Sequence, residues 1–255
     1  MADTLCVKLI ANAGLLLEYE GTTLMLDGIY GREGHPFSNL SEDVWNKMLQ
    51  GEPPFDNIDF LLFSHAHPDH FSPEMTMTYL KQRRVKGIFM PYTRSVSESG
   101  LSDLIRQEGI PCALLSEQTD HAAYKITPHI SVRAFRTLHL DKKFDKVKHF
   151  CYLITFGDKT ILFTADMDYV TEDLNRIKNL RLRAAFINPL FFSVLRRGKF
   201  FRGKLNTGRI CVYHVPFAED DDMGMRGILE RDIAQWPAER AWVTALLEPF
   251  QEMNL

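Results

Sequence analysis

The sequence is poor in cysteine and lacks the spacings that cysteine-based sites use. Its four cysteines lie far apart, and no pair has the CxxC spacing of a zinc site. They are Cys6, Cys112, Cys151 and Cys211. Their spacing indicates no disulfide framework, which fits a reducing compartment. Because each lies among apolar neighbours, we expect all four to be small core residues.

Long apolar runs and a strong excess of one charge are also missing. No run approaches the roughly 18 residues of a membrane-spanning helix. The start, Met1-Ala2-Asp3, lacks the basic and apolar regions of a signal peptide. We therefore expect a cytoplasmic protein without a membrane span. Lys and Arg total 30 against 33 Asp and Glu, a net charge of −3, which excludes a strongly basic nucleic-acid coat but leaves room for a local basic patch.

No linker rich in Pro, Gly or Ser divides the chain, so we expect one domain over residues 1–255. Apolar runs predict strands at 6–11, 14–20, 22–27, 58–63, 87–90, 112–115, 130–138, 150–156, 160–164, 184–188 and 209–213. Helices are predicted at 42–49, 73–84, 95–108 and 172–180, and the tail 223–253 is predicted as two helices broken at Pro237. Meanders of strands that alternate with helices indicate an α/β layered fold.

Histidines and aspartates collect where the predicted strands end. Side chains from separate strands converge at that edge of an α/β sheet. Imidazole and carboxylate are preferred ligands of Zn²⁺, and they also suit Fe and Mn. The residues in such places are His65, His67, His70, His139, His214, Asp27, Asp69 and Asp166. We interpret this set as a metal site.

The densest part of the set is the loop His65-Ala66-His67-Pro68-Asp69-His70, between a predicted strand and a predicted helix. Alternation places His65 and His67 on one side of an extended segment. Pro68 disfavours helical geometry at His67 and so keeps that segment extended. The turn can direct the adjacent Asp69 and His70 to a second ion. One short loop can therefore serve two metal ions.

This loop, HAHPDH, resembles the signature of the metallo-β-lactamase superfamily. The rest of that pattern follows in order: a meander that ends in Asp27, His139 in TLHL, Asp166 in LFTAD and His214 in VYHVPF. The opening ANAGLLLEYEGTTLMLDG is most similar to the branch that contains ascorbate-6-phosphate lactonase and N-acylphosphatidylethanolamine phospholipase D. The resemblance spans residues ~5 to ~216. It implies a four-layer αββα sandwich of two mixed β-sheets.

The resemblance also implies a site for two divalent metal ions, with zinc expected and Mn or Fe as alternatives. His65, His67 and His139 would hold the first ion. Asp69, His70 and His214 would hold the second, and Asp166 would bridge the two. Asp27 would orient a ligand histidine or the metal-bound water, and Asp69 would carry a proton. Asp168 competes with Asp166, and His129 with His139; position at a strand end favours Asp166 and His139.

A bridging aspartate is usually absent from the true β-lactam hydrolases of this superfamily, so Asp166 argues against β-lactam hydrolysis. No flavin motif follows, which disfavours the diiron oxygen-reducing branch. We therefore expect a hydrolase whose metal-bridging hydroxide cleaves an ester, lactone or phosphodiester bond in a small, anionic metabolite. The alternatives are a nuclease or phosphodiesterase that acts on nucleic acid, and a metal-binding protein without turnover.

Two further features have open interpretations. His149 opens the strand after the His139 loop and is a candidate substrate-binding residue, with a surface histidine as the alternative. The segment 191–204 interleaves aromatic and basic residues, a pattern that can grip phosphates or stacked bases. It also suits an exposed hairpin with an apolar root, or a dimer contact in a homo-oligomer. Its residues are Phe191, Phe192, Phe200, Phe201, Arg196, Arg197, Lys199, Arg202 and Lys204.

Overall fold

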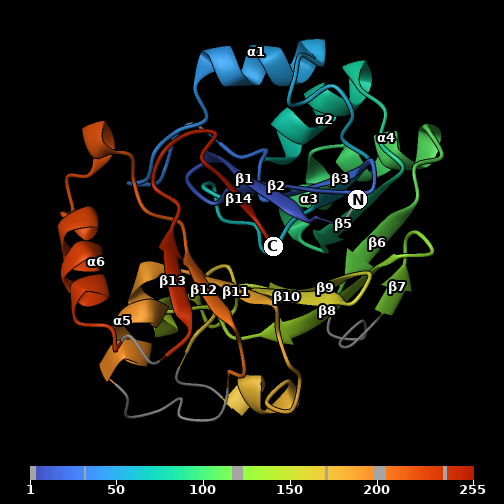
Figure 1. Ribbon diagram of the computed structural model, residues 1–255. Helices are drawn as coiled ribbons and strands as arrows, with labels where there is room; N and C mark the ends of the chain where they lie inside the picture. The colour runs from blue at the N-terminus through green and yellow to red at the C-terminus, as the bar shows by residue number, and fades with distance from the viewer. Residues whose placement is uncertain (1–3, 32, 117–122, 170–171, 198–204, 238–239) are drawn as a thin grey trace. The chain divides into compact units, whose positions relative to one another are not determined.

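The computed structural model describes residues 4–31, 33–116, 123–169, 172–197, 205–237 and 240–255 (Figure 1). The chain divides into two compact units, Met1–Thr119 with Glu248–Asn254, and Asp120–Leu247 with Leu255. Each unit contains one seven-stranded mixed sheet with its own helices. These sheets and helices confirm the predicted α/β class. The prediction of one domain over residues 1–255 stays a prediction.

The sheet of the first unit has the strand order β14-β1-β2-β3-β4-β5-β6. An antiparallel meander of β1 (Cys6–Ala11), β2 (Gly14–Tyr19) and β3 (Thr22–Leu26) continues in parallel through β4 (Phe60–Leu62), β5 (Gly87–Pro91) and β6 (Cys112–Leu115). At the other edge, β14 (Glu252–Asn254) pairs antiparallel with β1. Because β3 and β4 are parallel, the segments that follow them leave the sheet at the same edge.

The helices of the first unit are α1 (Glu42–Gln50), α2 (Pro73–Gln82), α3 (Arg94–Glu98) and α4 (Leu101–Gln107). Figure 1 shows α1 and α2 on the same side of the first sheet. The start of α2 is fixed by Ser72, whose side chain accepts a hydrogen bond from the Met75 N–H, and by Pro73 in the first turn. The loop between β4 and α2 is therefore held at both ends.

The sheet of the second unit has the strand order β13-β12-β11-β10-β9-β8-β7. Its antiparallel part consists of β7 (Ala123–Lys125), β8 (Ile130–Thr137), β9 (His149–Phe156) and β10 (Lys159–Phe163). Then β11 (Ala184–Ile187), β12 (Arg209–Val212) and β13 (Trp242–Ala245) continue parallel to β10. The carboxyl ends of β10, β11 and β12 therefore meet at one edge.

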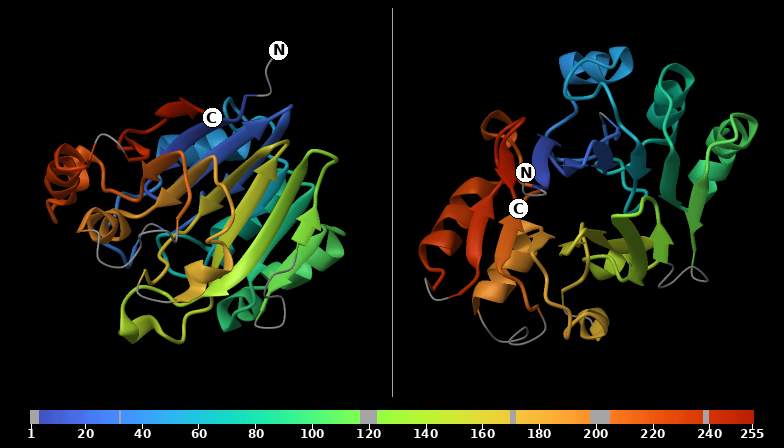
Figure 2. Two further views of the ribbon diagram at one scale, coloured as in Figure 1. Left: turned by 60° about the horizontal axis from the view of Figure 1, so that its bottom comes forward. Right: turned by 45° about the vertical axis from the view of Figure 1, so that its right-hand side comes forward.

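Two helices, α5 (Pro189–Arg197) and α6 (Met225–Ala234), lie on one side of this second sheet (Figure 2). Phe191 and Phe192 of α5 and Leu229 of α6 are buried in one apolar cluster with Leu162 and Val212 of the sheet. Short 3₁₀ helices are η2 (Lys142–Phe144), η3 (Glu172–Arg176) and η4 (Ala218–Asp220). In the part of the chain that the structure describes, no helix is long and apolar enough to cross a membrane.

Several predicted elements are wrong in length or type. The helix predicted at 95–108 is two helices, because Gly100 adopts a left-handed φ of 82° between them. The predicted helix 172–180 is the shorter η3. In the tail, α6 fits the first predicted helix, but β13 and β14 replace the second. Trp242–Ala245 is short and pairs with β12, and Met253 pairs with Val7. Those distant partners decide the conformation.

Candidate metal centre

The HAHPDH loop of the first unit leaves β4 and returns to α2 in a fixed path. Asp27 N donates to Leu62 O at 2.9 Å, which joins the end of β3 to the end of β4. Gly31 N donates to Pro68 O at 2.7 Å, and a Cβ at Gly31 would lie only 3.2 Å from that oxygen. Ser72 N donates to Ile29 O at 3.0 Å. The ligand loop is thus tied to the segment that follows β3.

Asp27 holds the histidines of this loop in place through buried hydrogen bonds. Its carboxylate accepts hydrogen bonds from Ser64 N at 2.7 Å and from Ser64 Oγ at 2.5 Å, and its Oδ2 lies 2.8 Å from His70 Nδ1. All these groups are fully buried. Since a carboxylate only accepts, we infer that His70 carries its proton on Nδ1. Its Nε2 then presents a lone pair.

Ser64 extends the same arrangement to His65. Its hydroxyl has one proton, which it donates to Asp27, so it accepts from His65 Nδ1 at 2.9 Å. His65 Nε2 is then also left as a lone pair. This Asp27–Ser64–His65 chain is the kind of carboxylate-to-histidine support that metal-ligating imidazoles use.

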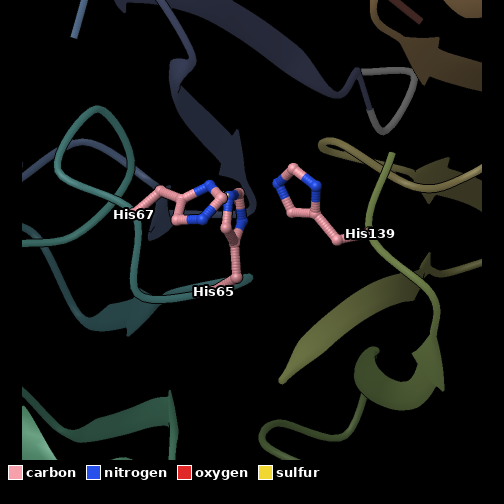
Figure 3. Close-up of side chains that lie close together, drawn as sticks. All are labelled: His65, His67 and His139. Carbon is pink, nitrogen blue, oxygen red and sulfur yellow. Dashed lines mark hydrogen bonds between the residues drawn. The ribbon is translucent and has the colours of Figure 1, made fainter. Parts of the chain in front are cut away.

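His65 and His67 lie with their rings together on this loop (Figure 3). His65 Nε2 lies 3.2 Å from His67 Nδ1. Two nitrogens bound tetrahedrally to one Zn²⁺ at its usual bond length are about 3.4 Å apart. The pair therefore fits a common ion. Asp69 Oδ2 and His70 Nε2, 3.5 Å apart, form a second pair of donors on the same loop.

The second unit gathers His139, Asp166 and His214 at the edge where β10 and β12 end. Asp166 Oδ2 lies 3.7 Å from His139 Nε2, and Asp166 Oδ1 lies 3.7 Å from His214 Nε2. Both distances exceed those of a hydrogen bond. They are close to the separation of about 3.4 Å expected for two ligands of one tetrahedral ion. The carboxylate thus places one oxygen beside each of two histidines.

Backbone and side-chain contacts hold these three residues in place. Leu140 N donates to Asp166 O at 2.7 Å, and His139 Nδ1 donates to Leu140 O, so the lone pair of this imidazole is on Nε2. Ala165, with a left-handed φ of 45°, turns the chain after β10. The carbonyl of Ala165 accepts from Asn188 Nδ2 at 3.1 Å. Asn188 Oδ1 in turn accepts from Phe191 N at 2.8 Å at the start of α5.

Neither of the two competing residues belongs to the groups of possible ligands found among the described residues. Asp168 follows Asp166 by two residues, and its N–H donates to Leu138 O at 2.8 Å. His129 is exposed in the turn between β7 and β8, where its carbonyl accepts from Gly157 N at 2.8 Å. The strand-end positions of His139 and Asp166 are therefore the ones that the second unit brings together.

His149 is buried at the start of β9, so the interpretation as a surface histidine is wrong. Its Nδ1 lies 2.7 Å from Thr137 Oγ1, and its ring is perpendicular to that of His139 at 5.6 Å between centroids. It contacts a proposed metal ligand directly. Its predicted role in substrate binding stays a prediction.

The segment 191–204 is not the exposed hairpin considered as one interpretation, as far as it is described. Residues 189–197 form α5, and Phe191 and Phe192 are fully buried. Arg196 Nε lies 2.6 Å from Asp232 Oδ1, and Arg196 Nη1 donates to Gln235 at 2.8 Å. The remaining residues of the pattern lie outside the described residues: Lys199, Phe200, Phe201, Arg202 and Lys204. A cluster of phosphate-gripping groups on 191–197 is therefore not supported.

Sequence reasoning missed three supporting residues. Ser64 directly precedes His65, so its position in the motif could have indicated it. Asn188, before Pro189 at a strand end, had the signal of a helix N-cap. Thr137 carried no signal, because its contact with His149 depends on the register of β8 and β9. The cysteines are all free thiols; Cys151 and Cys211 are buried as predicted, whereas Cys6 and Cys112 are only half-buried.

Comparison with known families identifies the chain. The sequence profile of the beta-lactamase superfamily domain matches residues 42–190, which is more than half of the sequence. The chain therefore belongs to the metallo-β-lactamase superfamily. No curated protein matches it.

Solved structures show the same fold. CmlA, a diiron beta-hydroxylase from Streptomyces venezuelae, is similar with 18% identity and a TM-score of 0.63; the match covers 100% of this chain but 54% of CmlA. Igni18, a metallo hydrolase from the archaeon Ignicoccus hospitalis, has 13% identity, coverages of 99% and 98%, and a TM-score of 0.63. YhfI from Bacillus subtilis, a metallo-beta-lactamase fold protein, has 15% identity, coverages of 99% and 99%, and a TM-score of 0.61. These likenesses confirm the predicted fold class.

Proposed function

We propose that this protein is a dinuclear metal-dependent hydrolase of a small, anionic ester, lactone or phosphodiester. The observation that carries the proposal is the position of Asp166. Each of its carboxylate oxygens lies 3.7 Å from the Nε2 atom of a different histidine. A carboxylate that serves two neighbouring ligand sets suits a pair of ions better than a single ion.

The ligand assignment joins the donors of both units. We assign the first ion to His65, His67 and His139, and the second ion to Asp69, His70, Asp166 and His214, with Asp166 shared. The donor chemistry supports this assignment, because the first unit offers four donors and the second three. Two ions that share a bridging carboxylate need about six or seven protein ligands. The assignment therefore requires both units.

Two divalent ions, when bound, acidify a shared water and polarise the bond to be cleaved. Around them, the chain's own residues have distinct tasks. Asp27 and Ser64 fix the tautomers of His65 and His70, so that both present Nε2. Asp69, buried beside His70, is the proposed proton carrier. Zinc is the proposed metal; manganese and iron suit the same donors, and the similar structure of CmlA is that of a diiron protein.

The contacts of Arg196 favour a small-molecule substrate over nucleic acid. Arg196 is engaged by Asp232 and Gln235 rather than offered to a phosphate backbone. The net charge of −3 also disfavours a polyanion. The opening motif supports the lactonase and phospholipase branch, so phosphorylated lactones and phosphodiesters are the first substrates to test. A nuclease would instead show substrate binding that weakens steeply with salt.

Metal analysis of the purified protein, followed by a panel of chromogenic phosphodiesters, lactones and thioesters, tests the proposal. We expect two equivalents of metal and turnover of at least one ester class. His67→Ala should lose mainly the first ion, and His214→Ala mainly the second. If either variant keeps two tightly bound equivalents, the ligand assignment is wrong. A metal-replete protein that is inert on the whole panel would favour the binding protein without turnover.

A further inference from the structure

A cavity lies in the second unit at the amino ends of its parallel strands. It has a volume of about 480 Å³ and is lined by Asp158, Lys159, Arg181, Leu182, Arg183 and Gly208. Lys159 begins β10, Arg183 directly precedes β11, and Gly208 directly precedes β12. Asp166, Asn188 and His214 follow the opposite, carboxyl ends of β10, β11 and β12. The cavity and the proposed metal ligands of this unit therefore lie at opposite ends of the same strands.

The cavity carries an excess of positive charge. Arg181 and Arg183 stand on either side of Leu182, which is buried and forms a bridge with Thr207, and all three residues line the cavity. Both arginines are exposed, and within the described ranges neither forms an ion pair. Lys159 lies 3.6 Å from Asp158, which compensates one charge. Two arginines that line one cavity are thus without an ion-pair partner among the described residues, and an anion would stabilise their charges.

We propose that this cavity binds a small molecule through a phosphate group, such as a phosphate monoester or a diphosphate. The planar guanidinium forks of two arginines match phosphate oxygens in pairs of hydrogen bonds. The volume falls in the range of small-molecule sites, about 300–1,000 Å³.

This site is separate from the proposed metal centre. A strand of four or five residues spans roughly 15 Å, so a phosphate at Arg181 and Arg183 cannot also contact Asp166 or His214. Binding at this cavity therefore adds a second ligand site to the protein. It does not depend on the proposed hydrolase function.

Calorimetric titration of the metal-loaded protein with inorganic phosphate tests the proposal. We expect one phosphate per chain, and an affinity reduced by about tenfold or more in the double variant Arg181→Gln/Arg183→Gln, because each charge-assisted hydrogen bond is strong. The matched control is Arg94→Gln/Arg106→Gln, which removes the same charge from exposed positions of the first unit. This control should bind phosphate as the parent protein does.

Three results would overturn the proposal. Absence of phosphate binding by the parent protein would show that the cavity is no anion site. Equal binding in the Arg181→Gln/Arg183→Gln variant would place the phosphate elsewhere, for example at the metal centre. An equal loss in the Arg94→Gln/Arg106→Gln control would reveal a nonspecific effect of net charge. Thermal unfolding of each variant checks that the fold is intact.

Discussion

Asp27 and the residues it contacts determine which nitrogen each histidine of the loop can offer. One carboxylate receives Ser64 N, Ser64 Oγ and His70 Nδ1, and through the Ser64 hydroxyl it also orders His65. None of these groups reaches water, since all are fully buried. Both histidines therefore present Nε2 in a fixed orientation, which would lower the reorganisation needed to bind the proposed ions.

Asp27→Asn should weaken metal binding by about 10- to 100-fold, the usual effect of losing a group that supports a ligand. The amide has only one accepting oxygen for three donors, so a buried donor is left unpaired at a cost of about 1–3 kcal/mol. Metal titration and thermal unfolding measure the two effects. Unchanged metal affinity would show that Asp27 has no part in preparing the ligands.

Asp166→Asn keeps the shape of the side chain but removes the charge between the two proposed ions. We expect loss of one ion or, at saturating metal, a rate lower by about 10²-fold or more. Asp168→Asn is the matched control and should reduce the rate far less, because the contact of Asp168 with the Leu138 carbonyl is a hydrogen bond from its backbone N–H, which the substitution keeps. If Asp168→Asn abolished activity and Asp166→Asn retained it, the register of this ligand would be shifted by two residues.

The thiols of Cys112 and Cys211 should react slowly in the native protein. Burial raises the pKa of Cys112 to about 11 and of Cys211 to about 12, above the ordinary value near 8.5. The thiolate is the nucleophile, so at pH 8 these residues should label slowly with an aromatic disulfide reagent, and faster as the pH rises toward 11.

The same burial favours the folded state below pH 8.5, and this contribution is lost as the pH rises through the folded pKa values. Rapid native labelling of Cys211 at pH 8 would contradict the packing; all four thiols should react in denaturant.

At the scale of elements, Asn188 couples helix α5 to the turn that carries Asp166. Its Oδ1 caps the helix through Phe191 N, while its Nδ2 binds the Ala165 carbonyl. Two substitutions distinguish the helix cap from the hydrogen bond to Ala165. Asn188→Ser retains a good N-cap but its short side chain cannot reach Ala165, whereas Asn188→Ala loses both contacts.

We expect Asn188→Ser to keep thermal stability near that of the parent and to weaken binding of the metal pair, because the Ala165–Asp166 turn loses a support. Asn188→Ala should show the same metal defect and lose about 1 kcal/mol more from the cap. Metal affinity measured beside thermal unfolding distinguishes the two. If Asn188→Ser bound metal like the parent protein, Asn188 would be a helix cap only.

The sequence predicted the strands that carry ligands better than the elements at the edges. The buried runs before His65, Asp166 and His214 fall within two residues of β4, β10 and β12, because these strands are apolar enough to be recognised locally. In contrast, β13 and β14 were predicted as helix, since their pairing partners lie far away in the chain. The supporting roles of Ser64 and Asn188 were not predicted. Hydrogen bonds between loops depend on the three-dimensional positions of the residues, which cannot be read from their spacing along the chain.

The proposed metal centre takes its ligands from both units of the protein. Donors at 65–70 come from the first unit, and those at 139, 166 and 214 from the second. Each group is ordered by contacts within its own unit, through Asp27 in one case and through the Leu140–Asp166 pairing in the other. The proposed hydrolase activity needs both groups on the same pair of ions.

Anomalous diffraction from crystals of the metal-loaded protein, recorded at the absorption edge of the metal found by elemental analysis, tests this sharing most directly. We expect two anomalous peaks about 3.5–4 Å apart. One should lie within bonding distance of His65, His67 and His139, the other near Asp69, His70 and His214, with Asp166 between them. A single peak, or two peaks each ligated by residues of one unit alone, would contradict the dinuclear centre proposed for this protein.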